Sequence, residues 1–169
     1  MPYFLRAIYN NIKWDKTQFP SWLKKGDLPS CIIKDLRADD NALSLWEILD
    51  DKSNLLDIIA AFVSSSRDGI KSNFDYALLN AEYLDELTFP ASKEPANTAY
   101  RNINHYHRNV ANLSLNSVVR LAYLLSIHGE FDRMGWKEIS VRLKEAHTRG
   151  QLDLTKMKPP LLKQLGITK

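Results

Sequence analysis

Apolar and polar positions alternate with a period of two in two segments of the chain. Residues 3–12 are rich in aromatic and branched side chains and divide them between two faces. Residues 42–49 divide theirs in the same way, with Trp46 and Ile48 on one face and Leu45 on the other. Strict alternation is typical of half-buried strands. We therefore expect a strand in each segment and pairing between the two.

Apolar side chains recur at helical spacing through much of the remaining chain. The clearest stripe consists of Leu55, Ile58, Ile59, Phe62 and Val63. Residues 115–127 are nearly all apolar, which predicts a helix buried on most sides, with Ser114 as its cap and Gly129 at its end. We expect further helices beginning near Asn73, over residues 136–146 and over residues 159–166, and a short helical segment at residues 30–36.

Residues 88–113 show the least regular pattern, with two prolines and five asparagines. Loops of this length are usually functional in a compact domain, and a short strand over residues 103–110 is an alternative for part of it. The patterns together predict an α+β fold, in which a small N-terminal β-sheet of two or three strands packs on a helical body of four to five helices. We expect a single domain over residues 1–169. The alternative is a subdivision near residues 88–100. It would divide the chain into an acidic N-terminal α/β part and a basic helical C-terminal part.

Charge is distributed unevenly along the chain, although the net charge is only +3. Residues 1–94 contain 11 Lys and Arg against 15 Asp and Glu, whereas residues 95–169 contain 12 against 5. The sequence has no acidic residue between Glu94 and Glu130. Such asymmetry favours a polyanion or an acidic partner for the second half. The alternative explanation is a solvated basic surface that balances the acidic half, within the molecule or in an oligomer.

The first residues lack the basic and apolar segments of a secretory signal peptide. No apolar run approaches the roughly 18 residues that a membrane-spanning helix needs. Cys31 is the single cysteine, which excludes an intramolecular disulfide and a thiolate metal site within one chain. We expect a cytoplasmic protein that has no membrane contact and no cofactor.

Six carboxylates crowd a 17-residue window: Asp35, Asp39, Asp40, Glu47, Asp50 and Asp51. Nucleases hold Mg²⁺ with two or three carboxylates at fixed geometry, commonly with a lysine two residues after a glutamate. Leu49 stands at that position after Glu47. Paired aspartates are also typical of turns at strand ends. We therefore predict no metal site in this window.

Arginine precedes histidine at a similar spacing in two places. Five residues separate Arg101 from His107, and four separate Arg142 from His147. This spacing resembles the loose Arg-then-His pattern of the HEPN ribonucleases, in which the His and Arg of two protomers meet at a dimer interface and cut RNA without metal. The resemblance implies Arg101 and His107 as catalytic candidates. The chain departs from that all-α family in its predicted strands and in the Pro- and Asn-rich setting of Arg101.

His105 and His107 are separated by one residue. On a strand they share one face, which suits a pair of metal ligands. No third ligand stands at a telling distance, and histidines on a surface loop are the alternative explanation. We predict no metal site, and these two histidines are the candidate ligands if one exists.

Basic and aromatic side chains are interleaved in the second half of the chain. Arg and Lys neutralise phosphates, and Tyr stacks on bases. The candidate nucleic-acid-binding residues are Arg101, Tyr106, Arg108, Lys156 and Lys158. No recognition helix with basic and amide side chains on one face is visible.

The sequence has no phosphate-cradling glycine loop and no nucleophile elbow. We hypothesise a non-enzymatic cytoplasmic interaction protein. Its role would be that of an accessory subunit, or of an antitoxin- or immunity-like partner, in a microbial protein complex. It would bind another protein or a second copy of itself. The apolar residues 115–127, with Trp14 and Trp22 expected to be exposed, supply the interface core. A nucleic-acid-binding protein that uses the basic C-terminal half is the first alternative, and a HEPN-like metal-independent ribonuclease is the second.

Overall fold

The computed structural model describes residues 1–8, 14, 30–36, 42–65, 73–85, 91–93, 95–111 and 113–168. The strands within these ranges are β1 (Tyr3–Ile8), β2 (Leu43–Ile48), β3 (Asn73–Asn80), β4 (Ala91–Ser92), β5 (His107–Val110) and β6 (Glu130–Gly135). The helices are α2 (Ser30–Asp35), α3 (Leu55–Ser64), α4 (Ala81–Asp85), α5 (Leu115–His128), α6 (Trp136–Thr148) and α7 (Pro159–Leu165), together with the 3-10 helices η2 (Arg101–Tyr106) and η3 (Leu154–Lys156).

The described strands form one antiparallel sheet in the order β4-β5-β2-β1-β3-β6. β1 pairs with β2 on one side and with β3 on the other, so that Tyr3 lies opposite both Ile48 and Asn80. The predicted pairing of the first two strands is therefore confirmed. β5 and β6, which come from the second half of the chain, pair with β2 and β3 from the first half.

The prediction of a sheet of two or three strands is wrong, because the described residues form a sheet of six strands. The α+β class is confirmed. The prediction of a helix that begins near Asn73 is also wrong, since residues 73–80 form β3 and α4 begins only at Ala81. β3 lies between β1 and β6, and its side chains from Phe74 to Leu79 are all buried. A strand covered on both faces lacks the alternation of apolar and polar residues that identifies a half-buried strand.

The segment expected to be irregular, residues 88–113, contains β4, η2 and β5 within its described part. The alternative of a short strand is confirmed for His107–Val110. The residues before it form η2 instead, in which Ile103 is buried.

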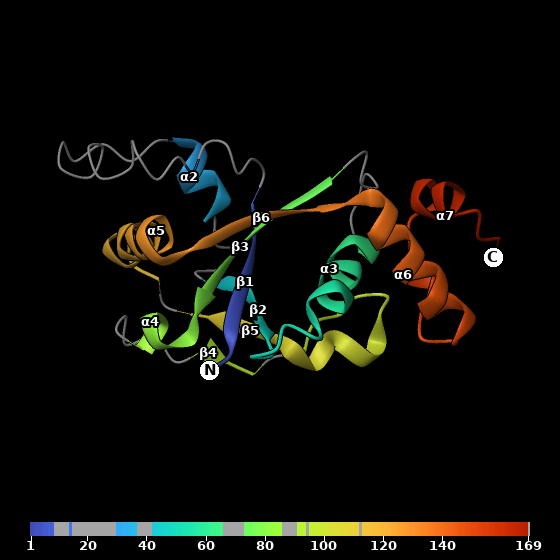
Figure 1. Ribbon diagram of the computed structural model, residues 1–169, viewed down its shortest axis with the longest axis horizontal. Coiled ribbons are helices and arrows are strands. Elements are labelled where there is room, and N and C mark those ends of the chain that lie inside the picture. The colour runs from blue at the N-terminus through green and yellow to red at the C-terminus, as the bar shows by residue number, and fades with distance from the viewer. Residues whose placement is uncertain are drawn as a thin grey trace.

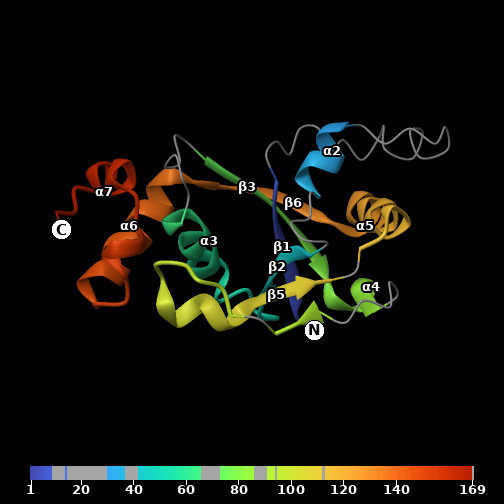
Figure 2. The ribbon, with the colours of Figure 1, turned by 180° about the vertical axis from the view of Figure 1, so that it is seen from behind.

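The sheet lies between two helical layers (Figures 1 and 2), and its side chains divide between the two buried clusters on its faces. α3 and α6 cover one face, and α7 packs beside them at the end of the molecule. On this face Leu5 and Trp46 of the sheet share a buried cluster with Ile58, Leu143 and Leu161. Burial of this apolar surface is the main force that holds the layer to the sheet.

The opposite face of the sheet is covered by α2 and α5 (Figure 2). There Leu45 and Leu79 lie in a second buried cluster with Ile32 of α2 and with Leu121 and Leu125 of α5. The sheet is therefore the middle layer of three, and its two faces have separate cores.

α5 begins and ends where the sequence predicts. The side chain of Ser114 accepts a hydrogen bond from the backbone N–H of Ser117 (3.2 Å), and the helix stops at Gly129. A Cβ atom at Gly129 would lie 2.3 Å from the carbonyl oxygen of Leu125, so that only glycine permits this close approach. The chain can thus pass directly from α5 into β6.

The C-terminal helices are fastened to the segment that precedes η2. Tyr100 and Leu152 form an isolated antiparallel bridge, and the N–H of Asp153 donates to the carbonyl oxygen of Ala99 (2.8 Å). These contacts and the buried leucines of α7 fix the α6–α7 end of the molecule against the α3 layer. None of the helices in the described ranges has the length and apolarity needed to cross a bilayer.

Candidate binding surfaces

Ion pairs join the acidic first half of the chain to its basic second half. Three such pairs occur among the described residues: Arg108–Glu47, Arg142–Asp57 and Arg133–Asp75. A fourth pair, Lys52–Glu130, joins the two halves with the charges reversed. In the third, the Nε atom of Arg133 lies 2.5 Å from the Oδ1 atom of the buried Asp75. Part of the charge asymmetry in the sequence is therefore balanced inside the molecule, as one of the two explanations expected.

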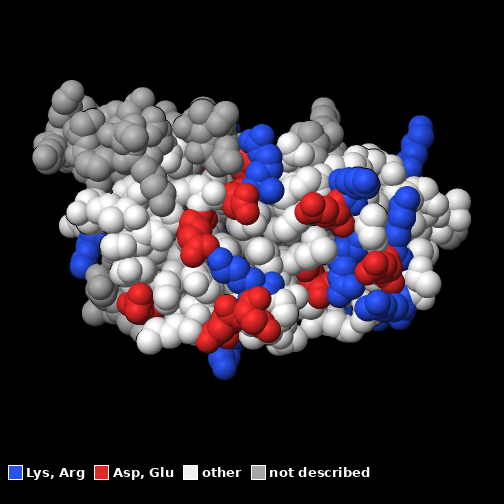
Figure 3. Space-filling view, viewed as in Figure 1, with Lys and Arg blue, Asp and Glu red and all other residues white. Residues whose placement is uncertain are grey.

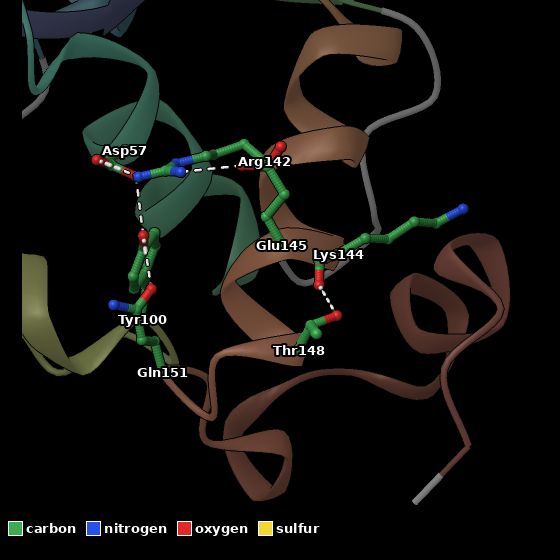
Figure 4. A network of polar contacts seen from close by, with 7 residues as sticks. All are labelled: Asp57, Tyr100, Arg142, Lys144, Glu145, Thr148 and Gln151. Atoms are coloured by element: carbon green, nitrogen blue, oxygen red, sulfur yellow. Dashed lines mark hydrogen bonds and ion pairs between the residues drawn. The ribbon is translucent and has the colours of Figure 1, made fainter.

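One of these pairs lies in a network that connects three elements (Figure 4). Asp57 on α3 accepts a hydrogen bond from the Nη2 atom of Arg142 on α6 (2.8 Å) and another from the hydroxyl of Tyr100 (2.8 Å). Arg142 also donates to Glu145 (3.0 Å), and the side-chain Oε1 atom of Gln151 lies 3.3 Å from the Tyr100 hydroxyl. The network holds α6 and the segment before η2 against α3.

The pKa values of Tyr100 and Arg142 are both raised. Burial, and next the hydrogen bond to Asp57, raises the pKa of Tyr100 to about 12. The same carboxylate, through its hydrogen bonds, raises the pKa of the Arg142 guanidinium above its ordinary value. At neutral pH the tyrosine is therefore neutral and the arginine charged, and their hydrogen bonds to Asp57 form a structural clamp between α6, the segment before η2 and α3.

The two catalytic candidates are engaged with other parts of the structure. Arg101, at the start of η2, donates from Nη2 to Asp153 (2.8 Å). This pairing contributes, after the hydrogen bond from Thr155, to a pKa of about 2 for Asp153. His107, at the start of β5, packs edge-on against the ring of Trp46 with 5.2 Å between ring centroids. Each of the two side chains therefore has an interaction partner of its own, and their catalytic role stays a prediction.

The candidate metal ligands belong to different elements, because His105 lies in η2 and His107 in β5. The ring of His105 lies against that of Tyr106 at a tilt of 37°, with 4.1 Å between ring centroids. The described ranges contain no group of three or more His, Cys, Asp or Glu side chains that could hold a metal ion.

The acidic window is dispersed in the fold. The carboxylate of Asp35 accepts a hydrogen bond from the indole N–H of Trp14 (2.9 Å), Glu47 pairs with Arg108, and Asp51 accepts from the backbone N–H of Ser53 (3.0 Å). The adjacent aspartates of this window, Asp39 and Asp40, lie outside the described residues. The described carboxylates thus serve packing, pairing and turn formation.

The candidate nucleic-acid-binding residues divide into buried and exposed ones. Arg108 is only 7% exposed, and it donates to Glu47 and to the backbone carbonyls of His105 and His107 (2.7 and 2.8 Å). Tyr106 is half-buried against the α3-side core. A phosphate group therefore does not reach the Arg108 guanidinium without rearrangement of β5, whereas part of Tyr106 remains exposed.

The lysines among these candidates are exposed. Lys158 precedes α7 and has its side chain at the surface. Lys156 is also exposed and donates a hydrogen bond to the side-chain oxygen of Asn97. Both therefore remain available to an external anion.

Trp14 does not supply an exposed aromatic surface, so this expectation is wrong. It is 3% exposed, its indole N–H is bonded to Asp35, and its ring packs on Phe131 of β6 with 5.3 Å between centroids. Trp22 lies outside the described residues.

α5 presents an apolar surface to solvent. Its inner side packs on the sheet through Leu121 and Leu125, whereas Leu115 is 72%, Tyr123 46% and Ile127 41% exposed. We call these three residues the α5 face. The prediction that α5 is buried on most sides is therefore wrong, because the sheet covers one side and these three apolar side chains are exposed on another.

Exposed cations gather at the other end of the molecule, over α6, η3 and α7 (Figure 3). They are Lys144, Arg149, Lys156, Lys158 and Lys163, which we call the basic surface. Within the described part of the chain none of the five forms an ion pair. The candidates predicted from the sequence do not include Lys144 and Arg149. Lys144 lies on α6 outside the buried stripe of Ile139, Leu143 and Ala146, and Arg149 directly follows the last residue of the helix. Both positions indicate exposure.

Comparison of the chain with protein-family models, with curated proteins and with solved structures finds no match.

Proposed function

We propose that this chain is a non-enzymatic interaction protein, an accessory subunit or an antitoxin- or immunity-like partner in a microbial cytoplasmic complex. The α5 face is the surface by which it contacts another protein. The observation that carries the proposal is the exposure of three large apolar side chains on one helix that is otherwise packed firmly on the sheet.

Exposed apolar area of this kind favours association. Removal of apolar surface from water contributes about 25 cal/mol for each Å² buried. Aromatic residues such as Tyr123 are enriched at the cores of protein interfaces. Because Leu121 and Leu125 hold α5 on the sheet, the face is already arranged for a partner and little conformational entropy is lost on binding.

The partner is expected to be a different protein whose contacting surface carries apolar and acidic side chains. α5 contains Arg120 and His128 but no Asp or Glu. A two-fold contact between copies, centred on this face, brings the two Arg120 side chains toward each other without a carboxylate to compensate them. Carboxylates on a different protein complement this charge.

The test is purification of the protein from its source cells at low salt, with mass spectrometry of the companion, followed by binding measurements on the purified pair. Tyr123→Ser with Ile127→Ser is expected to weaken binding at least tenfold, because truncation of interface anchors commonly has this effect. Val141→Ser removes a comparably exposed apolar side chain from α6 and is expected to bind like the unchanged protein.

Two outcomes contradict the proposal. One is a companion that binds the double variant as tightly as the unchanged protein, with circular dichroism showing that both are folded. The other is a source-cell preparation that contains the protein alone as a monomer.

A further inference from the structure

The basic surface differs from the rest of the molecule in how its charges are balanced. Arg108, Arg133 and Arg142 each pair with a carboxylate from the first half of the chain. Between Trp136 and Thr168 the chain has seven Lys and Arg against three Asp and Glu. The ion pairs within the molecule therefore leave an excess of positive charge at the α6–α7 end.

Two of the three acidic residues of this end are already paired with an arginine. Glu145 is bonded to Arg142 (3.0 Å), and Asp153 to Arg101 (2.8 Å). Lys156 donates a hydrogen bond to the neutral amide of Asn97. Like charges gathered on one surface repel each other, and an anion that binds there relieves this repulsion.

The surface is held rigidly, which favours contact with a regular array of anions. α6 is clamped to α3 through Arg142 and Asp57, and α7 buries Leu161 and Leu162 in the α3-side core. The bridge between Tyr100 and Leu152 fixes the segment that leads to η3. The lysine backbones are thus ordered in advance, and binding orders only their side chains.

We propose that the basic surface binds the phosphate backbone of double-stranded nucleic acid, without reading its sequence. Lysine-rich surfaces are unlike protein interfaces, whose cores are depleted in Lys. Trp136 is the sole Phe, Tyr or Trp within residues 136–168, and it packs against the core, so that these residues offer unpaired bases no stacking platform. A membrane surface calls for several exposed large apolar side chains beside the cations, and in the described part of this end only Val141 is one.

This binding is independent of the α5 face, which lies at the opposite end of the molecule (Figure 1). Phosphate contacts position a protein on a duplex without carrying base information. The basic surface would therefore contact the phosphodiester backbone that DNA and RNA duplexes share, and the experiment below tests each type of duplex separately.

The test is fluorescence anisotropy of labelled duplexes of about 20 base pairs, DNA and RNA, each in two unrelated sequences, over a range of salt concentrations. Each phosphate contact contributes about −0.9 to the slope of log K against log salt. The unchanged protein is expected to bind all sequences of one duplex type alike, with a steep slope. Lys144→Gln with Lys158→Gln and Lys163→Gln is expected to reduce the slope by about 2 to 3 and weaken binding more than tenfold at low salt.

Two matched single variants distinguish binding at the basic surface from a general effect of the net charge of the protein. Lys163→Gln removes one exposed lysine from the basic surface, and Lys34→Gln removes one from α2 at the other end of the molecule. Only the first is expected to change the slope. Absence of duplex binding at low salt, equal effects of the two single variants, or an unchanged slope in the triple variant overturns the proposal. Binding to vesicles of anionic lipid in place of the duplexes also overturns it.

Discussion

The carboxylate of Asp57 depends on donors from two distant parts of the chain. Arg142 reaches it from α6 and Tyr100 from the segment before η2, and both side chains are largely withdrawn from solvent. A charge in such a position is stable only while its hydrogen bonds are in place. The clamp therefore fixes the angle at which α6 leaves the core and, with it, the place of the basic surface.

We expect Arg142→Met to lower the free energy of unfolding by about 2 kcal/mol, because it leaves Asp57 without its guanidinium hydrogen bonds. Urea unfolding followed by circular dichroism measures this change. Lys137→Gln, an exposed position on the same helix, is the control and is expected to have no measurable effect. A combined Asp57→Asn and Arg142→Met variant should be more stable than the sum of the two single losses. Additive losses would contradict the clamp.

At the scale of residues, the sequence identifies side chains of suitable chemistry but not their partners. Arg108 has the charge of a phosphate ligand, yet β5 sets it opposite Leu45 of β2, within reach of Glu47. The two members of that pair stand 61 residues apart, and the sequence contains no signal for the strand register that joins them. Lys158 is identified correctly as an exposed cation, because lysine is ordinarily exposed and this expectation does not depend on a partner elsewhere in the chain.

At the scale of elements, Gly129 decides how α5 meets β6. The next junction, between β6 and α6, also has a glycine, Gly135, but a Cβ atom there would meet nothing within 4 Å. The first glycine is required by a close approach of the backbone, and the second is not.

We expect Gly129→Ala to destabilise the protein by about 1–3 kcal/mol, because its Cβ atom collides with the carbonyl oxygen of Leu125 and the backbone must shift. Gly135→Ala is the matched control. Its backbone, with φ of −73° and ψ of 145°, suits alanine, so that the change is expected to be neutral or to stabilise by up to about 1 kcal/mol. Thermal unfolding of the two variants side by side provides the comparison. Equal stability of the two would show that the α5–β6 junction is less tight than its geometry indicates.

α3 and α6 are predicted correctly because their apolar side chains recur at helical spacing, which can be recognised without the fold. α6 buries the stripe of Ile139, Leu143 and Ala146 and exposes other positions, whereas no residue of α3 is exposed. β3 is buried on both faces, and β6 has its two apolar side chains, Phe131 and Met134, on opposite faces among charged residues. Neither pattern alternates, because the environment of these strands is set by neighbours that are distant in sequence.

At the scale of the whole molecule, the two halves of the chain are interleaved rather than adjacent. β5 and β6 pair with β2 and β3, and the ion pairs of Arg108 and Arg142 cross between the same halves. The α3-side core likewise contains residues from both. The change of charge sign near residues 88–100 therefore coincides with a crossover inside one sheet.

This arrangement predicts that the chain unfolds in a single cooperative transition. Incorporation of 5-fluorotryptophan allows the signals of Trp46 in β2 and Trp136 in α6 to be followed separately by fluorine NMR during urea unfolding, with circular dichroism as a third probe. All three curves are expected to coincide, because loss of either half removes strand partners and core from the other. Arg142→Met should shift the two fluorine curves equally. Separate midpoints, with the Trp136 signal lost before that of Trp46, would instead support a division of the chain near residues 88–100.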